Sequence, residues 1–85
     1  MKVSIITVSY NAVATLQQTI ESVLAQNYSD IEYWVIDGGS ADGTKDLLAS
    51  YGQRINYISE PDNGIYDAFN KGLKLVTGDV IGIIG

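Results

Sequence analysis

Three short polar segments, TVSYN, DGGSADG and SEPDNG, carry the side chains best suited to chemistry, and each follows an apolar run. Thr7, Ser9, Tyr10 and Asn11 belong to the first segment, and Asp37 opens the second. A carboxylate at a strand end can accept hydrogen bonds from the N–H edge of a nucleobase or from ribose hydroxyls, and a tyrosine ring can stack on a base. These five residues therefore predict a nucleoside pocket, with Asp37 opposite the other four.

The same side chains also have structural interpretations. Tyr10 can pack beneath the helix that follows it, Asn11 can cap that helix, and Asp37 can cap the turn before Ser40. For Asn11 the spacing favours the cap. For Asp37 the two interpretations are balanced, because a carboxylate at a buried strand end is costly without a partner.

The common phosphate-binding loops are missing from the sequence. The first apolar run is followed by SYNAVA, which contains no glycine and matches neither a dinucleotide-binding G-x-G-x-x-G nor a P-loop. The arginine-ended glycine loop of sugar nucleotidylyltransferases is absent from the same place. The third run ends in Ser59 and Glu60, without the aspartate that a phospho-receiver domain requires.

Length and composition limit the possible functions further. The 85 residues suffice for one small domain, and the net charge of -5 argues against binding nucleic acid or an anionic membrane through bulk charge. No cysteine or histidine is present, which excludes disulfides, zinc sites of the usual kinds and His-based triads within these residues. Without a signal peptide or a long apolar span, the expected location is the cytoplasm or the cytoplasmic face of a membrane.

Strands and helices are expected to alternate along the chain. Apolar, β-branched runs predict four strands, the last of them buried, over 3–10, 31–37, 54–59 and 79–84. Apolar residues at helical spacing predict three helices over 11–28, 41–51 and 65–76. This order with short links predicts an α/β fold, a Rossmann-like parallel sheet of four strands in the order 3-2-1-4 with helices on both faces. Its three polar segments should then meet at one edge of the sheet.

The helices carry more detailed predictions. The first is expected to bury an apolar face made of Leu16, Ile20, Val23 and Leu24. The third is expected to bury a face made of Ile65, Phe69, Leu73 and Val76. Asn11, or Thr15 together with Gln18, can cap the first helix, and Ser40 is the predicted N-cap of the second.

Three longer segments, VSIITVSYNA, ESVLAQNYSDIEYWVIDGGSADGT and SEPDNGIYDAFNKGLKLVTGDVIG, together resemble the N-terminal half of family 2 glycosyltransferases, which have the GT-A fold. The resemblance covers nearly the whole chain, with the motifs in the family's order. The run EPDNGIYDAFNKG is most similar to bacterial members that build capsule, O-antigen or exopolysaccharide.

The resemblance implies roles for individual residues. Thr7 and Tyr10 match residues that line the nucleobase pocket, and Asp37 matches one that hydrogen-bonds the base, often uracil. Lys71 matches a possible diphosphate contact. Its structural alternative is an i,i+4 pair with Asp67 on a solvated helix face, which would contribute only about 0.2–0.5 kcal/mol.

The resemblance also implies which parts of the enzyme lie elsewhere. In the family, the fourth strand leads into a D-x-D-type motif that binds Mg²⁺ or Mn²⁺, which in turn holds the donor's diphosphate. That motif is expected immediately after Gly85, and the acceptor site and the catalytic Asp or Glu base are expected later still. Residues 1–85 are therefore expected to form a truncated donor-nucleotide-binding part, with no catalytic or metal-binding residue.

The activity implied is an inverting, metal-dependent glycosyltransferase. It would transfer a sugar from a nucleotide-diphosphate sugar, such as a UDP-sugar, to a hydroxyl of a saccharide or lipid-linked saccharide in cell-surface polysaccharide biosynthesis. The 85 residues alone are expected to be inactive. The alternative is a non-catalytic nucleotide-binding or interaction module, which predicts a homo-oligomer paired through the exposed edge of the fourth strand.

Overall fold

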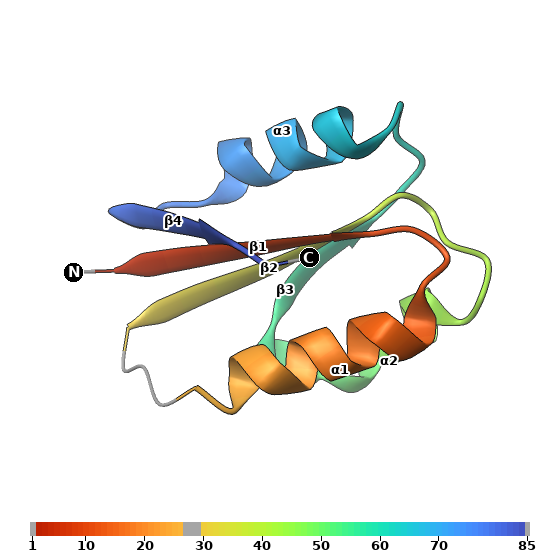
Figure 1. Cartoon of the computed structure of the whole chain (residues 1–85), viewed down its shortest axis with the longest axis horizontal. Helices are drawn as coiled ribbons and strands as arrows, with labels where there is room; N and C mark the ends of the chain where they lie inside the picture. Colours follow the sequence, from red (N-terminus) through yellow and green to blue (C-terminus); the bar gives the residue numbers. More distant parts are fainter. Residues whose placement is uncertain (1, 27–29, 85) are drawn as a thin grey trace.

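The computed structural model describes residues 2–26 and 30–84 and shows a single parallel sheet (Figure 1). Its strands are β1 (Val3–Ser9), β2 (Ile31–Asp37), β3 (Asn56–Ser59) and β4 (Val80–Ile83). They lie in the order β3-β2-β1-β4, and every neighbouring pair is parallel. The predicted fold class and strand order are therefore confirmed. β3 is shorter than predicted, because a short 3-10 helix (Gly52–Arg54) takes up the start of that run.

Helices cover both faces of the sheet, as predicted. The three α-helices are α1 (Val13–Leu24), α2 (Thr44–Ser50) and α3 (Ile65–Leu75). α1 and α2 lie on one face and α3 on the other (Figure 1). Side chains of β1 and β2 alternate between the two layers, so that Ile5 and Val35 pack toward α1 and α2 while Ile6 and Ile36 pack toward α3.

The first two helices begin differently from the prediction. α1 buries Leu16, Ile20 and Val23 as expected, but neither candidate side chain caps it. Instead the Asp42 carboxylate accepts a hydrogen bond from the Val13 N–H at 3.1 Å, and its other oxygen accepts from the Thr44 N–H at 3.3 Å. One carboxylate from the loop thus caps the starts of both helices, while Gly43, not Ser40, holds the N-cap position of α2.

The buried face of α3 also departs from the prediction. Ala68 and Gly72 face the sheet, whereas Leu73 is exposed. A Cβ on Gly72 would lie 3.0 Å from a methyl carbon of Ile6, so small residues at this face let the helix approach the strands closely. Phe69 and Val76 are half-buried, and the side chain of Ile65 lies outside the described part of the chain. The buried residues of α3 are therefore the small ones that let the helix lie close to the sheet, and the larger Leu73 is left outside the contact.

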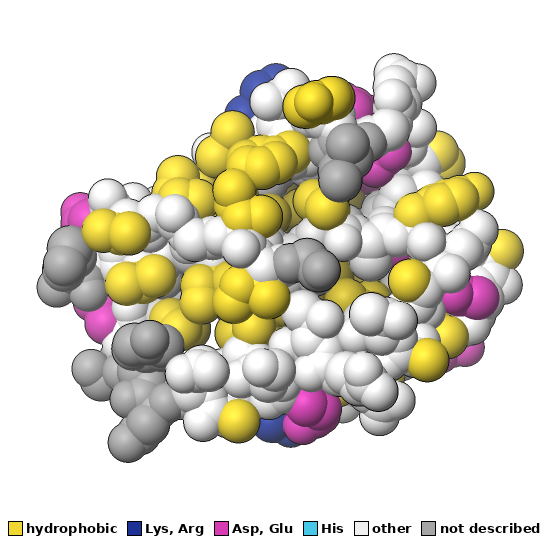
Figure 2. Space-filling model, viewed as in Figure 1, with side chains coloured by type: hydrophobic (Ala, Val, Ile, Leu, Met, Phe, Trp, Pro, Cys, Tyr) yellow, Lys and Arg dark blue, Asp and Glu magenta, His cyan; other side chains and the backbone are white. Residues whose placement is uncertain are grey.

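β4 is an exposed edge strand, and the prediction that it is buried was wrong. Val80, Ile81 and Ile83 are 45%, 43% and 54% exposed. Figure 2 shows hydrophobic side chains gathered over β4 and α3. The residues just before this strand are held by the start of β1, where the Ser4 hydroxyl accepts from the Gly78 N–H at 2.8 Å. β4 is thus well anchored but uncovered in this part of the chain.

Candidate nucleotide-binding site

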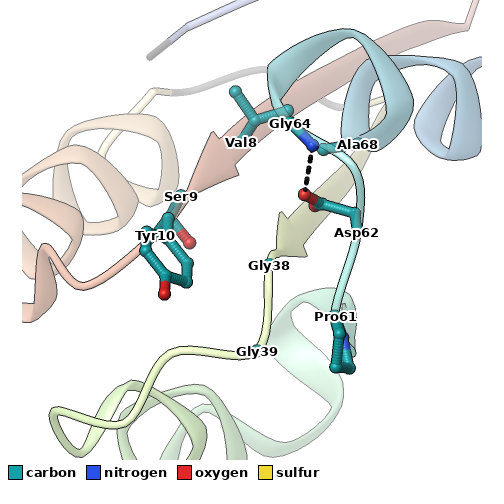
Figure 3. Close-up of a pocket in the computed structure, with 9 residues that line it drawn as sticks. All are labelled: Val8, Ser9, Tyr10, Gly38, Gly39, Pro61, Asp62, Gly64 and Ala68. Atoms are coloured by element: carbon teal, nitrogen blue, oxygen red, sulfur yellow. Dashed lines mark hydrogen bonds between the residues drawn. The ribbon is translucent and has the colours of Figure 1, made fainter.

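An open cleft of about 610 Å³ lies at the edge of the sheet where the parallel strands end. The end of β1 forms one side, the turn after β2 forms the floor, and the loop before α3 forms the other side (Figure 3). The described residues that line it are Val8, Ser9, Tyr10, Gly38, Gly39, Pro61, Asp62, Gly64 and Ala68. The three polar segments do meet at one edge, as predicted, but only part of each faces the cleft.

Two of the predicted site residues line this cleft. Tyr10 is 65% exposed, so its ring is free to contact a ligand, and Ser9 is half-buried beside it. Asp62 faces them from the loop before α3, with its carboxylate directed toward the middle of the opening (Figure 3). The cleft therefore has an aromatic side and a carboxylate side.

Gly38 lies between these two sides and leaves the space between them open. A Cβ at this position would lie 3.1 Å from Asp62 Oδ2 and 3.2 Å from Tyr10 Cδ1. These separations are tighter than ordinary van der Waals contact, so any side chain here would fill the space between the carboxylate and the ring. The absence of a side chain at residue 38 is what leaves the floor of the cleft open.

Asp37 lies beneath the cleft and does not line it. Its side chain is fully buried, and its Cα is in register with Ser9 of β1 and Ser59 of β3. Oδ1 accepts from the hydroxyls of Ser9 at 2.8 Å and Ser40 at 2.6 Å. Oδ2 accepts from the Ser40 N–H at 2.9 Å and the Ser59 hydroxyl at 2.9 Å. One carboxylate thus ties together three strand ends and the turn after β2.

These hydrogen bonds lower the pKa of the Asp37 carboxyl group. Burial alone would raise the pKa of the carboxyl, because it disfavours the charged form. The bonds from the Ser40 hydroxyl and N–H, followed by those from Ser9 and Ser59, outweigh burial and hold the pKa below its ordinary value of 3.8. Asp37 is therefore a charged structural centre whose acceptor positions are taken by the protein itself.

Thr7 and Asn11 also lie outside the cleft. The Thr7 hydroxyl is buried, 2.8 Å from the Tyr33 hydroxyl, and borders a separate hollow of about 160 Å³ against α1. Asn11 has a left-handed backbone with φ of 49°. Its side-chain oxygen accepts from the Ala41 N–H at 2.9 Å, and its own N–H donates to the Ser40 hydroxyl at 2.7 Å. Asn11 joins the loops after β1 and β2 and is not a helix cap.

Lys71 points to the loop before α3. Its ammonium group lies 3.1 Å from Glu60 Oε1 and 3.9 Å from Asp67 Oδ2, and it donates to the Pro61 carbonyl at 3.2 Å. These contacts hold the loop against the helix. The predicted alternative pair with Asp67 is present but longer than the pair with Glu60, and Lys71 does not line the cleft.

Comparison with known proteins identifies the family. The sequence profile described as Glycosyl transferase family 2 matches residues 4–85. The chain belongs to this family. An uncharacterised glycosyltransferase of Mycobacterium tuberculosis is 46% identical over 81 residues, which cover 93% of this chain and 31% of that protein. A PGL/p-HBAD biosynthesis glycosyltransferase of Mycobacterium bovis is 35% identical over 86 residues, covering 96% and 34%. The chain thus spans about a third of the length of these relatives.

Solved structures show that the fold is of the GT-A type. The chain superposes with a TM-score of 0.83 on a mannosyltransferase of Pyrobaculum calidifontis in complex with GDP-Man and Mn²⁺, at 24% identity over 94% of this chain and 26% of the other. For TarS of S. aureus in complex with UDP-GlcNAc, the TM-score is 0.84, at 23% identity over 99% and 26%. The predicted family and fold are both confirmed.

Sequence reasoning did not single out seven of the nine described residues that line the cleft in this glycosyltransferase family 2 chain, and Gly38 and Asp62 are the two of these that shape it most. Both lie in segments already expected at the correct edge of the sheet. A signal for Asp62 was available, because it is a carboxylate in the loop that follows the third strand. For Gly38 the signal was weaker, because only the positions of two other side chains show what its missing Cβ does.

The described residues contain no cluster of three metal-ligating side chains. Nowhere in 2–26 and 30–84 do three Asp, Glu, His or Cys side chains come together in a way that could hold a metal ion. Asp37 accepts hydrogen bonds from four internal donors, and Asp62 is the one carboxylate among the described residues that line the cleft.

In the same described ranges, no helix has the length and apolarity needed to cross a membrane.

Proposed function

We propose that this chain is the donor-nucleotide-binding part of an enzyme that transfers a sugar from a nucleotide-diphosphate sugar to an acceptor hydroxyl. The observation that carries the proposal is the open cleft at the carboxyl ends of the strands in a chain of this family. Ligands of open α/β sheets bind at this edge, near the strand where the order reverses, which here is β1. Two structural neighbours hold GDP-Man and UDP-GlcNAc, which supports the same class of donor.

Within the cleft we assign the nucleoside to the space beside Tyr10. Its exposed ring offers a flat apolar surface for stacking, and the Ser9 side chain lies next to it. None of the described lining residues is cationic, so the cleft suits a base or ribose better than a diphosphate. The phosphates would extend away from Asp62.

The metal, the catalytic base and the acceptor site would come from outside the described residues. The neighbour that binds Mn²⁺ supports a divalent cation in this fold, and the carboxylates described here do not provide its ligands. The chain is thus proposed to bind the donor without catalysing transfer, with inversion at the anomeric carbon a feature of the complete enzyme.

The acceptor is proposed to be a saccharide or lipid-linked saccharide of the cell surface. The relative named for PGL/p-HBAD biosynthesis supports a role in building surface glycans. We further propose that the enzyme works at the cytoplasmic face of the membrane, where it would find its nucleotide-sugar donor.

Calorimetric titration with UDP and GDP tests the proposal. One stacked base is worth about 1–3 kcal/mol, so the 85-residue chain is expected to bind weakly, with a dissociation constant on the order of 10 mM or higher. Added Mn²⁺ should change this little, because no three side chains among the described residues come together to hold the ion. If the protein as its gene encodes it binds no nucleoside diphosphate, with or without Mn²⁺, the proposal is wrong.

The exposed edge at β4 favours a second role, as an interaction surface. Val80, Ile81 and Ile83 present apolar side chains on a strand whose outer edge is free to pair in the described part of the chain. We propose that further strands of a longer GT-A domain cover this surface, or that a second copy of the chain does so.

Light scattering on the 85-residue chain tests this interface. The chain is expected to form dimers or larger assemblies, and Ile83→Lys should weaken assembly about tenfold or more, because burial of an isoleucine contributes about 1.5–3 kcal/mol. Ala49→Lys adds the same charge to the exposed side of α2 and should leave assembly unchanged. A chain that stays monomeric at every concentration would rule out the interface between copies.

A further inference from the structure

A second polar cluster lies at the edge of the sheet opposite the cleft, where the strands begin. Its centre is the Glu32 side chain of β2, which is only 14% exposed. Oε1 accepts from the Ser4 hydroxyl at 2.9 Å and from the Thr77 N–H at 2.7 Å, and Oε2 accepts from the Thr77 hydroxyl at 3.1 Å. The Lys2 ammonium group lies 3.7 Å from Oε2. One carboxylate thus joins β1 and β2 to the turn between α3 and β4.

This turn packs directly against the start of β1. The Ser4 hydroxyl, which donates to Glu32, also accepts from the Gly78 N–H at 2.8 Å. A Cβ on Gly78 would overlap this hydroxyl and would lie 2.9 Å from the Ser4 nitrogen and 3.0 Å from the Lys2 carbonyl oxygen. The same carbonyl accepts from the N–H of Asp79, the residue directly before β4, at 2.8 Å. The position of the turn is therefore set by close contacts on both sides of Ser4.

The sequence of β4 does not itself determine how the strand pairs with β1. The run VIGII is apolar or lacks a side chain at every position, so it has no alternation between apolar and polar residues. A strand without such alternation specifies its register only weakly. The observed pairing sets Val80 beside Val3 and Ile83 beside Ile6. Contacts outside the strand must therefore select this pairing.

From these contacts we infer that Glu32 is a positioning residue, which fixes the register of β4 on β1 through Ser4 and the turn over 77–79. β4 runs parallel to β1, and Val8 and Ser9 at the end of β1 line the cleft. The register at the start of β4 therefore determines where the chain that follows this strand emerges beside the cleft. A shift by two residues would move that point by about 6–7 Å along β1. The consequence for sugar transfer rests on the proposed function, whereas the register itself does not.

Hydrogen exchange of the protein as its gene encodes it, measured peptide by peptide with mass spectrometry, tests the inference. Glu32→Ala should speed amide exchange over 77–84 about tenfold or more, since a hydrogen bond to a charged group is worth roughly that factor. Exchange in β2 and β3 should change by less than about threefold, because β4 then opens on its own. Glu32→Gln should restore most of the protection, because its amide oxygen can still accept from the Thr77 N–H.

Glu21→Ala is the matched control. The Glu21 carboxylate accepts from the Tyr51 hydroxyl at 2.8 Å, in the layer formed by α1 and α2. Its removal takes away the same charge without touching the turn before β4, so exchange over 77–84 should match that of the wild type. Ser4→Ala removes only the bridging hydroxyl and is the milder second variant if Glu32→Ala does not fold. It should speed exchange over the same residues severalfold.

Two results would overturn the inference. Equal acceleration in all four strands would show that the cluster around Glu32 stabilises the sheet as a whole and does not position β4. Unchanged exchange over 77–84 in both Glu32→Ala and Ser4→Ala would show that β4 is held by other contacts. Titration of the wild type with UDP and GDP reports separately on the proposed function, and failure of both to bind would overturn that function while leaving the register inference intact.

Discussion

Replacement of Asp37 with alanine is expected to lower the free energy of unfolding by about 3–5 kcal/mol, because several donors lose their charged acceptor and each buried donor left unsatisfied costs about 1–3 kcal/mol. The change leaves the hydroxyls of Ser9, Ser40 and Ser59 and the Ser40 N–H without their acceptor. Stabilities of small domains are about 5–15 kcal/mol, so this loss is a large share of the total. Urea unfolding followed by circular dichroism measures the difference.

Asp37→Asn and Ser59→Ala provide graded comparisons. Asparagine keeps one acceptor for the Ser40 N–H, and the serine hydroxyls can rotate to accept from its amide, so the loss should be about 1–2 kcal/mol. Ser59→Ala removes one of the four bonds and should cost about 1 kcal/mol. A free energy of unfolding for Asp37→Ala within 1 kcal/mol of the wild type would contradict the structural role.

The pH dependence of the free energy of unfolding should show how much of the stabilisation by Asp37 comes from its negative charge and how much from the shape of its side chain. The folded-state pKa of Asp37 lies below 3.8, its ordinary value, so the unfolded chain binds the proton more readily. The stabilisation by the carboxylate is then complete above that value and is lost as the pH falls through the lower, folded-state pKa. Asp37→Asn should flatten the acid side of the stability profile. The Glu32 carboxyl, whose pKa is also lowered, should keep part of the slope in both proteins.

The overall fold could be predicted because its causes are local and repeated. Four β-branched runs, the helical spacing of Leu16, Ile20 and Val23, and short links together leave one simple topology. The edge at which the three polar segments meet follows directly from parallel strands. These features depend on periodicity and chain order, which a single sequence contains in full.

The site could be predicted only to the level of segments. Asp37 ends its strand, which makes it a candidate ligand, but three serines from three different segments saturate it in the folded chain. Asp62 lies beyond the end of its strand, and the loop held by Lys71 turns its carboxylate into the cleft. Tertiary hydrogen bonds decide which of the two carboxylates faces the cleft, and the spacing of residues along the chain does not reveal these bonds.

Packing caused the other errors. Leu73 has the helical spacing of a buried residue, but α3 approaches the sheet through Ala68 and Gly72, which leaves Leu73 at the side. The apolar run of β4 is typical of a strand covered on both faces, and in the described part of the chain it lies at an open edge. The apolar sequence of β4 indicates that the strand needs to be covered. Its exposed surface area depends on which other elements pack against it, and the sequence of the strand does not specify them.

A side chain at residue 38 is expected to weaken nucleotide binding in proportion to its size, without unfolding the protein. Gly38 does not have the left-handed backbone that favours glycine, and its Cβ would point into the open cleft. Gly38→Ala, at 3.1 Å from Asp62 Oδ2 and 3.2 Å from Tyr10 Cδ1, should weaken UDP binding about tenfold, a loss of about 1.4 kcal/mol. Gly38→Val should bring binding below detection, with unfolding free energies within about 1 kcal/mol of the wild type.

Gly43→Ala is the control for these variants, because it should lower the stability of the protein and leave UDP binding unchanged. Its φ is 91°, which alanine adopts only with strain, and nothing lies within 4 Å of the added Cβ. Stability should therefore fall by about 1–2 kcal/mol while the folded protein binds UDP as before. If Gly38→Val binds UDP like the wild type, the nucleotide does not occupy the space between Tyr10 and Asp62. If instead it unfolds while Gly43→Ala does not, residue 38 is part of the packed core and not the floor of a ligand site.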